Sequence, residues 1–284
     1  MESGSAPQRL EPLFEPFVRS FADLNAYVEK TWPESESDYP PNLNLTLRFF
    51  IRTMFSRARA VFMLLQAGSH WESEIVLRSL AEAAVKCATF ARRKNVEQLL
   101  GEFWIELQAS SDRKAALRAA MAQQLIAEGS SDHQIFEAVQ NPDWFSVEPE
   151  TNKRRRRRLD QEWSLPELIG KLSDETATIE PIVGLDAMLH SYGLQSEIVH
   201  VSSKYYDLLW DRFIRKDDLI PLENTHYCRQ MEDCLQITAL CITISLQRLG
   251  VASSDLRPPI RIANAFSQKI KPFREEFARS QGLV

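Results

Sequence analysis

The stretch Trp71–Ala91, WESEIVLRSLAEAAVKCATFA, decides the fold. Its apolar residues recur at intervals of three and four, which is the spacing of one face of an α-helix. Glu74, Arg78 and Glu82 also lie four residues apart, so these charged residues share one face. A buried helix face does not normally carry a charge in every turn. We therefore predict a helix whose polar stripe is either a structural network or a functional site.

A second stretch, His190–Trp210 (HSYGLQSEIVHVSSKYYDLLW), has a similar pattern. Tyr192, Ser196 and His200 lie four residues apart among apolar neighbours. Burying two polar faces in separate places would be costly, because each would leave hydrogen-bonding groups without partners. We therefore expect the two helices to pack side by side, with their polar residues within side-chain reach of each other.

Helical periodicity continues on both sides of these stretches. Leu43–Ala67 predicts a long helix that ends at Gly68, and Ser69 is placed to form a capping box with Glu72 at the start of the next helix. The short connection favours an antiparallel pair. Further helices are expected at residues 13–31, 95–108, 112–128, 131–139, 174–190, 194–215, 222–249 and 262–279, with another after Ser164. No segment alternates with a two-residue period, so the sequence predicts an all-α protein.

The expected architecture is a bundle of long antiparallel helices with a smaller helical excursion. We expect one helical domain over residues 13–257, with the excursion at 95–140 and a basic loop at 141–160. Residues 1–12 are predicted to be disordered. Pro258 and Pro259 are expected to end the core, so that residues 258–284 form a peripheral C-terminal helix.

The composition is that of an ordinary globular protein, with 44% hydrophobic and 26% charged residues. A net charge of −5 argues against nucleic-acid binding by the whole surface, so that any such binding would be local. We expect no membrane association, because no uncharged run, the one that contains Leu235–Gln247 included, is long enough for a span and the N-terminus does not resemble a secretory signal. The four cysteines form no CxxC pair and lie in apolar helical pattern, which indicates buried thiols in a cytoplasmic protein.

The polar stripes have both ordinary and functional interpretations. Arg78 and Glu82 have the spacing of a common ion pair on a helix surface, but an arginine held in a cleft would grip a phosphate or carboxylate. His200 fits a structural hydrogen-bonding role, whereas its neighbours Ser196 and Tyr192 are placed to orient its ring or relay a proton. No GxSxG turn is present, so the sequence does not predict a Ser-His-Asp triad.

Three blocks of this sequence resemble a bacterial helical family known only as a domain of unknown function. The blocks are LLQAGSHWESEIVLRSLAEAAVKCATF, WSLPELIGKL and YGLQSEIVHVSSKYYD, and the resemblance spans roughly residues 45–215. Members carry an early R-S-L-x-E-A block and a late Y-x-x-x-S-x-x-V-H block. The resemblance implies a helical fold and marks five motif positions as candidate catalytic residues, namely Arg78, Glu82, Tyr192, Ser196 and His200.

A more distant similarity is to the HEPN class of helical ribonucleases. Their signature is an arginine followed four to six residues later by histidine on one helix, and this chain has no such pair. Only the fold could bring Arg78 and His200 together. The similarity implies metal-independent cleavage of RNA, with His200 as general acid or base and Arg78 stabilising charge on the phosphate.

Six consecutive cations, Lys153, Arg154, Arg155, Arg156, Arg157 and Arg158, follow the predicted excursion. Charge repulsion favours a solvated loop for such a run. The alternative is a local phosphate-binding arm for RNA or DNA.

Glu197–His200 and Glu223–His226 have the Glu-x-x-His spacing of di-metal carboxylate bundles. The leading hypothesis nevertheless requires no metal or cofactor. It is a cytoplasmic bacterial effector directed at nucleic acid, acting in phage defence or stress response by analogy. One alternative is a non-catalytic interaction scaffold with a protein partner or a second copy of the chain. The third is a di-metal carboxylate enzyme.

Overall fold

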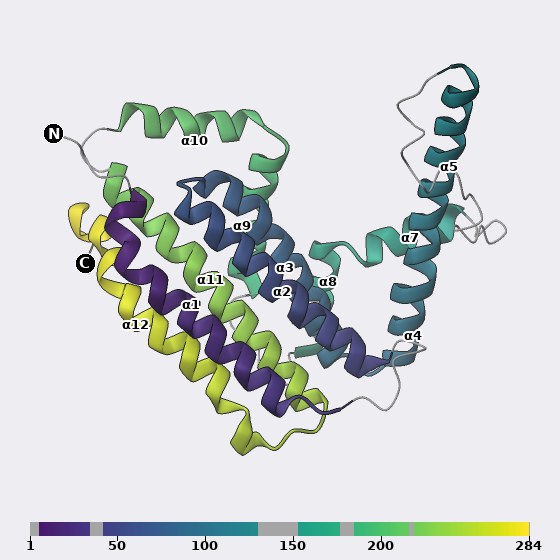
Figure 1. Cartoon of the computed structure of the whole chain (residues 1–284), viewed down its shortest axis with the longest axis horizontal. Helices are drawn as coiled ribbons and strands as arrows, with labels where there is room; N and C mark the ends of the chain where they lie inside the picture. The colour runs from purple at the N-terminus through teal and green to yellow at the C-terminus, as the bar shows by residue number, and fades with distance from the viewer. Residues whose placement is uncertain (1–5, 35–41, 130–152, 177–184, 216–218, 284) are drawn as a thin grey trace.

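The computed structural model describes residues 6–34, 42–129, 153–176, 185–215 and 219–283 (Figure 1). Within these ranges every regular element is helical and none is a strand. The prediction of an all-α fold is therefore confirmed.

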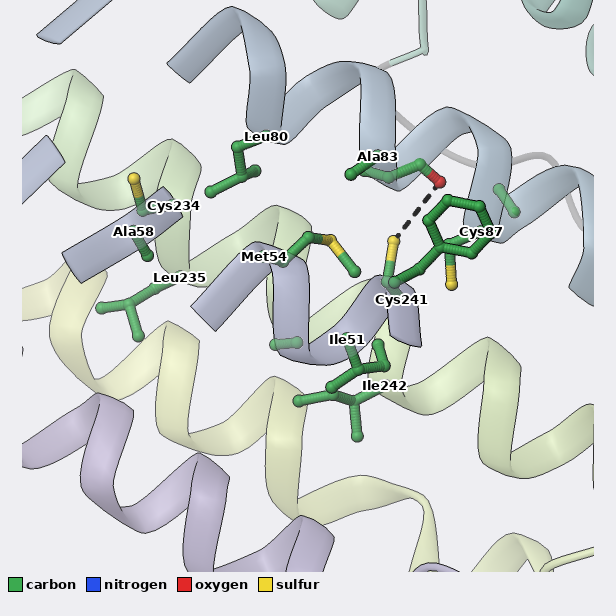
Figure 2. Packing of buried hydrophobic residues seen from close by; sticks show 14 of the residues in the cluster. Ile51, Met54, Ala58, Leu80, Ala83, Cys87, Cys234, Leu235, Cys241 and Ile242 are labelled. Carbon is green, nitrogen blue, oxygen red and sulfur yellow. Dashed lines mark hydrogen bonds between the residues drawn. The ribbon is translucent and has the colours of Figure 1, made fainter. Parts of the chain in front are cut away.

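Five long helices form the bundle: α1 (Ala6–Thr31), α2 (Leu43–Gln66), α3 (His70–Arg92), α11 (Leu219–Arg248) and α12 (Arg257–Ser280). Helix α11 contacts each of the other four, so it is the central element of the core. Figure 2 shows how side chains from three of the helices meet there, with Met54 of α2, Leu80 of α3 and Leu235 of α11 all fully buried. Their apolar stripes stabilise the bundle by removing this surface from water.

The turn between α2 and α3 begins as the sequence predicts. Gly68 has φ of 81°, a conformation that glycine adopts without strain. The Ser69 amide donates to the Leu64 carbonyl and the Gly68 amide to the Leu65 carbonyl, which is a Schellman motif. The predicted capping box of Ser69 and Glu72 is wrong, because the Ser69 side chain makes no capping hydrogen bond. Ser69 instead has its backbone committed to ending α2.

The four cysteines are buried and form no disulfide, as the sequence predicts. The Cys241 thiol lies 3.7 Å from the Ala84 carbonyl oxygen, so it joins α11 to α3 (Figure 2). Burial raises the pKa of Cys228 to about 12, and it raises the pKa of Cys234 as well. These thiols therefore behave as small core side chains.

The predicted domain limits are wrong at both ends. Residues 6–12 belong to α1 rather than to a disordered tail, and Leu10 is fully buried. Helix α12 is part of the bundle rather than peripheral, since Ala263, Phe266 and Ile270 are buried against the core. Pro258 and Pro259 lie in its first turn, where proline is compatible with a helix, so they start α12 instead of ending the core.

The excursion is more continuous than the sequence predicts. Helix α4 (Val96–Gly101), the π-helical turn η1 (Glu102–Glu106) and α5 (Leu107–Ala127) follow one another without a gap, so the two predicted helices at 95–108 and 112–128 are not separate. Figure 1 shows α5 extending away from the bundle. The helix expected at 131–139 lies outside the described residues.

The predicted basic loop is also corrected, because residues 153–160 are helical. They belong to α7 (Lys153–Glu162), which is followed by α8 (Leu165–Thr176). Leu159 of α7 is buried, and this contact with the core gives the charged helix a fixed side toward the protein. Residues 141–152 of the predicted loop lie outside the described ranges.

The single helix expected at 194–215 is two helices, α9 (Leu185–Val199) and α10 (Ser203–Ile214). The break is a second Schellman turn, in which the Ser202 amide donates to the Glu197 carbonyl and the Val201 amide to the Ile198 carbonyl. Val201 has φ of 49° in the position that glycine usually fills. The Ser202 hydroxyl then caps α10 by accepting from the Tyr205 amide.

Candidate functional site

The two polar stripes meet at the contact between α3 and α9. The Arg78 Nη2 atom donates to the Tyr192 hydroxyl at 2.7 Å, and the Arg78 Cζ atom lies 4.3 Å from the centre of the Tyr192 ring. Arg78 Nε also donates to Glu82 Oε1 at 3.3 Å. The expectation that the two sets lie within side-chain reach is therefore confirmed for Arg78 and Tyr192.

Ser196 lies farther along α9, and His200 lies just past its end. Gln195 donates to Glu74 and Tyr192 accepts from Arg78, so α9 runs antiparallel to α3 and its later residues approach the start of α3. His200 follows Tyr192 by eight residues, which is about 12 Å along a helix axis. Its side chain is exposed just past the end of α9. The register thus separates His200 from the Arg78 contact.

Glu74 is the most deeply buried carboxylate of the stripe, with only 3% of its surface exposed. It accepts hydrogen bonds from Gln230 Nε2 at 2.5 Å and from Gln195 Nε2 at 3.0 Å. Arg229 also donates to Glu74, and its other terminal nitrogen lies 2.8 Å from Asp233. Glu74 therefore joins α3 to both α9 and α11.

The partners of Glu74 on α11 were not singled out from the sequence. Arg229 and Asp233 are four residues apart, the same spacing that marks the α3 stripe. Burial raises the pKa of Asp233 to about 6, while the neighbouring Arg229 acts in the opposite direction. The charge of Arg229 is thus shared between two carboxylates in a partly dehydrated setting.

A cluster of aromatic and basic side chains lies at the start of α3. The Arg212 Cζ atom of α10 is 4.5 Å from the centre of the Trp71 ring, and the rings of His70 and Tyr227 are 5.4 Å apart. Burial and the charge of Arg212 lower the pKa of His70. Burial, followed by the same arginine, lowers the pKa of His226 to about 3. Both imidazoles are therefore neutral at physiological pH.

The Glu-x-x-His pairs do not assemble into a metal centre in the described part of the chain. No group of three or more His, Cys, Asp or Glu side chains is arranged there to hold a metal ion. Burial raises the pKa of Glu223, and the nearby charge of Arg212 opposes this shift only in part.

The cationic run has a defined orientation on α7. Leu159 faces the protein, and Arg155 makes two hydrogen bonds to Glu106, at 2.6 and 2.9 Å. Arg154, Arg157 and Arg158 are exposed. Arg158 also pairs with Glu162 at 2.8 Å, but 79% of its side chain remains exposed. The outer side of α7 therefore presents guanidinium groups to solvent.

Two tryptophans connect the base of this region, which consists of η1 and the end of α7, to the bundle. Trp163 donates to Glu102 at 2.9 Å, and Trp104 donates to Thr46 of α2 at 2.8 Å. The rings of Trp163 and Phe90 are 5.8 Å apart, which joins this base to α3. These contacts fix where α7 ends relative to the core.

The charge of the chain is unevenly distributed. Helix α7 carries six cationic residues and two carboxylates, and α5 carries three cationic residues and one carboxylate. Both helices are positively charged in a chain whose net charge is −5. The remainder of the protein is correspondingly acidic.

None of the helices in the described ranges combines the length and hydropathy that crossing a bilayer requires. No family model, curated protein or solved structure matches this chain. The resemblances to the helical family of unknown function and to HEPN ribonucleases therefore stay predictions.

Proposed function

We propose that this protein binds nucleic acid through the outer side of α7. The observation that carries the proposal is the exposed set Arg154, Arg157 and Arg158 on a helix held against the protein by Leu159. Guanidinium groups bind phosphate oxygens and displace the counterions that surround a nucleic acid. The acidic remainder of the protein would repel the same phosphates and so confine binding to this side.

The polar stripe of α3 has the contacts of a structural network, and this favours binding through α7 over catalysis as the main activity. Glu74 is surrounded by donors from α9 and α11, and Arg78 is engaged by Glu82 and Tyr192. These contacts are those of a network that holds three helices together. In this proposal the stripe stabilises the bundle and α7 binds the nucleic acid.

The test is fluorescence anisotropy with labelled 20-nucleotide RNA and DNA probes, single- and double-stranded, at several salt concentrations. Replacing Arg154, Arg157 and Arg158 with alanine should weaken binding by about tenfold or more and flatten its salt dependence, because fewer counterions are released. The matched control is the triple alanine variant of Arg19, Arg57 and Arg59, which are exposed on α1 and α2. The control removes equal charge and should bind like the wild type.

Equal weakening by both triple variants would show a general charge effect and overturn the assignment to α7. Absence of salt-dependent binding by the wild-type protein, to every probe, would overturn the proposal as a whole.

RNA cleavage is a second candidate, favoured by the contact between the two motif blocks at Arg78 and Tyr192. Arg78 Nη1 is buried without a hydrogen-bond partner among the described residues, which is consistent with a site for a further acceptor. The same RNA probes, separated on a denaturing gel after incubation, test it. Cleavage by the wild type that is abolished in Tyr192→Phe, which removes the hydroxyl that contacts Arg78, would support the nuclease. RNA that stays intact with both proteins would overturn the nuclease candidate and leave nucleic-acid binding as the proposed function.

A further inference from the structure

Helix α5 has an exposed apolar stripe on its outer face. Leu117 and Met121 are each 68% exposed and Leu125 is 42% exposed, and the three lie one turn apart. Ala119, on the opposite face, and Ala122, beside the stripe, are buried. The large apolar side chains are therefore largely exposed to solvent, on a helix that extends away from the bundle (Figure 1).

The ends of the stripe carry opposite charges. Lys114 lies seven residues before Met121 and Glu128 lies seven residues after it, and both side chains are exposed. Seven residues are close to two helical turns, so both lie on the same face as Met121. The face is thus basic at one end, apolar in the middle and acidic at the other end.

This pattern is self-complementary about Met121 when two such helices run antiparallel. A two-fold axis through the level of Met121 places Leu117 opposite Leu125 of the other copy and Lys114 opposite Glu128. A parallel arrangement would instead place like charges together. Two-fold interfaces of this isologous kind are the commonest in homo-oligomers.

We propose that the protein forms a homodimer through antiparallel pairing of its α5 helices, centred on Met121. The paired segment, Lys114 to Glu128, spans fifteen residues, or about 22 Å. Such a short contact is at the low end of specific interfaces, so the dimer is reversible and depends on concentration. The inference does not depend on nucleic-acid binding.

Sedimentation equilibrium over a wide concentration range tests the interface with the full-length protein. Met121→Glu should weaken dimerisation by about a hundredfold or more, because two carboxylates would be buried against each other at the axis. The matched control is Phe213→Glu on α10, where the replaced side chain is 78% exposed. The control should dimerise like the wild type, and circular dichroism should show unchanged helix content in both variants.

Charge reversal tests the antiparallel register. Lys114→Glu and Glu128→Lys should each weaken the dimer by about tenfold, because two-fold symmetry makes each change repulsive at two places. The double variant should return to wild-type affinity. A wild type that stays monomeric up to about 100 μM, loss of the dimer in Phe213→Glu but not in Met121→Glu, or failure of the double variant to recover would each overturn the proposal.

Discussion

Arg78 and Tyr192 are 114 residues apart in the chain, yet their side chains share a hydrogen bond of 2.7 Å. The same guanidinium lies over the tyrosine ring at 4.3 Å from its centre. One tyrosine therefore contacts the arginine through both its hydroxyl and its aromatic face. This pair joins the two sequence blocks that carry the polar stripes.

Tyr192→Phe should separate the two parts of this contact. The ring remains to stack with Arg78, but the hydroxyl acceptor is lost and a partly buried donor is left without a partner. We expect the free energy of unfolding to fall by about 1–2 kcal/mol in a urea titration. Tyr192→Ala should cost more, because the ring is lost as well. Equal stability of Tyr192→Phe and the wild type would contradict the assigned hydrogen bond.

Glu74 and Glu82 offer a comparison between two carboxylates of one stripe. Glu74→Ala should lower the free energy of unfolding by about 3–5 kcal/mol, because Arg229, Gln230 and Gln195 would lose a buried acceptor. Glu82→Ala should cost less than about 1 kcal/mol, because that side chain is 39% exposed and its ion pair with Arg78 is partly solvated. Similar losses in the two variants, measured by denaturant unfolding, would refute the difference in burial.

His226 should make the protein less stable in mild acid. Its pKa is about 3 in the folded protein, because of burial and nearby arginines, against an ordinary value of 6.5. The unfolded chain binds a proton in this interval and the folded protein does not. The stabilising contribution is therefore complete above pH 6.5 and is lost as the pH falls from 6.5 toward 3. The slope is about 1.4 kcal/mol per pH unit for one such histidine.

The comparison of wild type with His226→Gln isolates this effect. The wild-type curve by itself would mix two effects, because the raised pKa of Asp233 gives a stability change of the opposite sign between its ordinary value and about 6. Asp233 is present in both proteins, so its effect cancels in the comparison. The difference between the melting temperatures of wild type and His226→Gln should shift in favour of the variant as the pH falls from 7.5 to 5. A difference between the two melting temperatures that stays constant over this pH range would rule the mechanism out.

Val201 should be a site of removable strain. It has φ of 49°, which is unfavourable for a β-branched side chain, and its side chain is exposed, so little burial would be lost on replacement. Val201→Asn keeps a side chain that tolerates this conformation. We expect the variant to be more stable by about 1 kcal/mol in thermal or urea unfolding, with the exposed Val199→Asn as a control that gains nothing. A less stable Val201→Asn would disprove the strain.

The turn at Val201 shows why one boundary was not predictable from the sequence. Gly68 identified the end of α2 because glycine is the usual residue with positive φ. The corresponding position after α9 holds valine, so the pattern at 194–215 read as one helix. The proline pair at 258–259 led to the opposite error, a predicted end where the structure begins a helix. Proline both follows helix ends and occupies first turns, so the sequence alone does not separate the two cases.

The sequence by itself determined the all-α class, the turn at Gly68, the buried cysteines and the expectation that the two polar stripes meet. These depend on local periodicity and on the cost of burying polar groups alone, which any compact fold must respect. Only the tertiary structure decided which polar residues are partners. The antiparallel register of α3 and α9 joins Arg78 to Tyr192 and leaves His200 at the other end, while α11 supplies Arg229 to Glu74. Register depends on contacts between distant segments, and helical spacing within one segment carries no information about them.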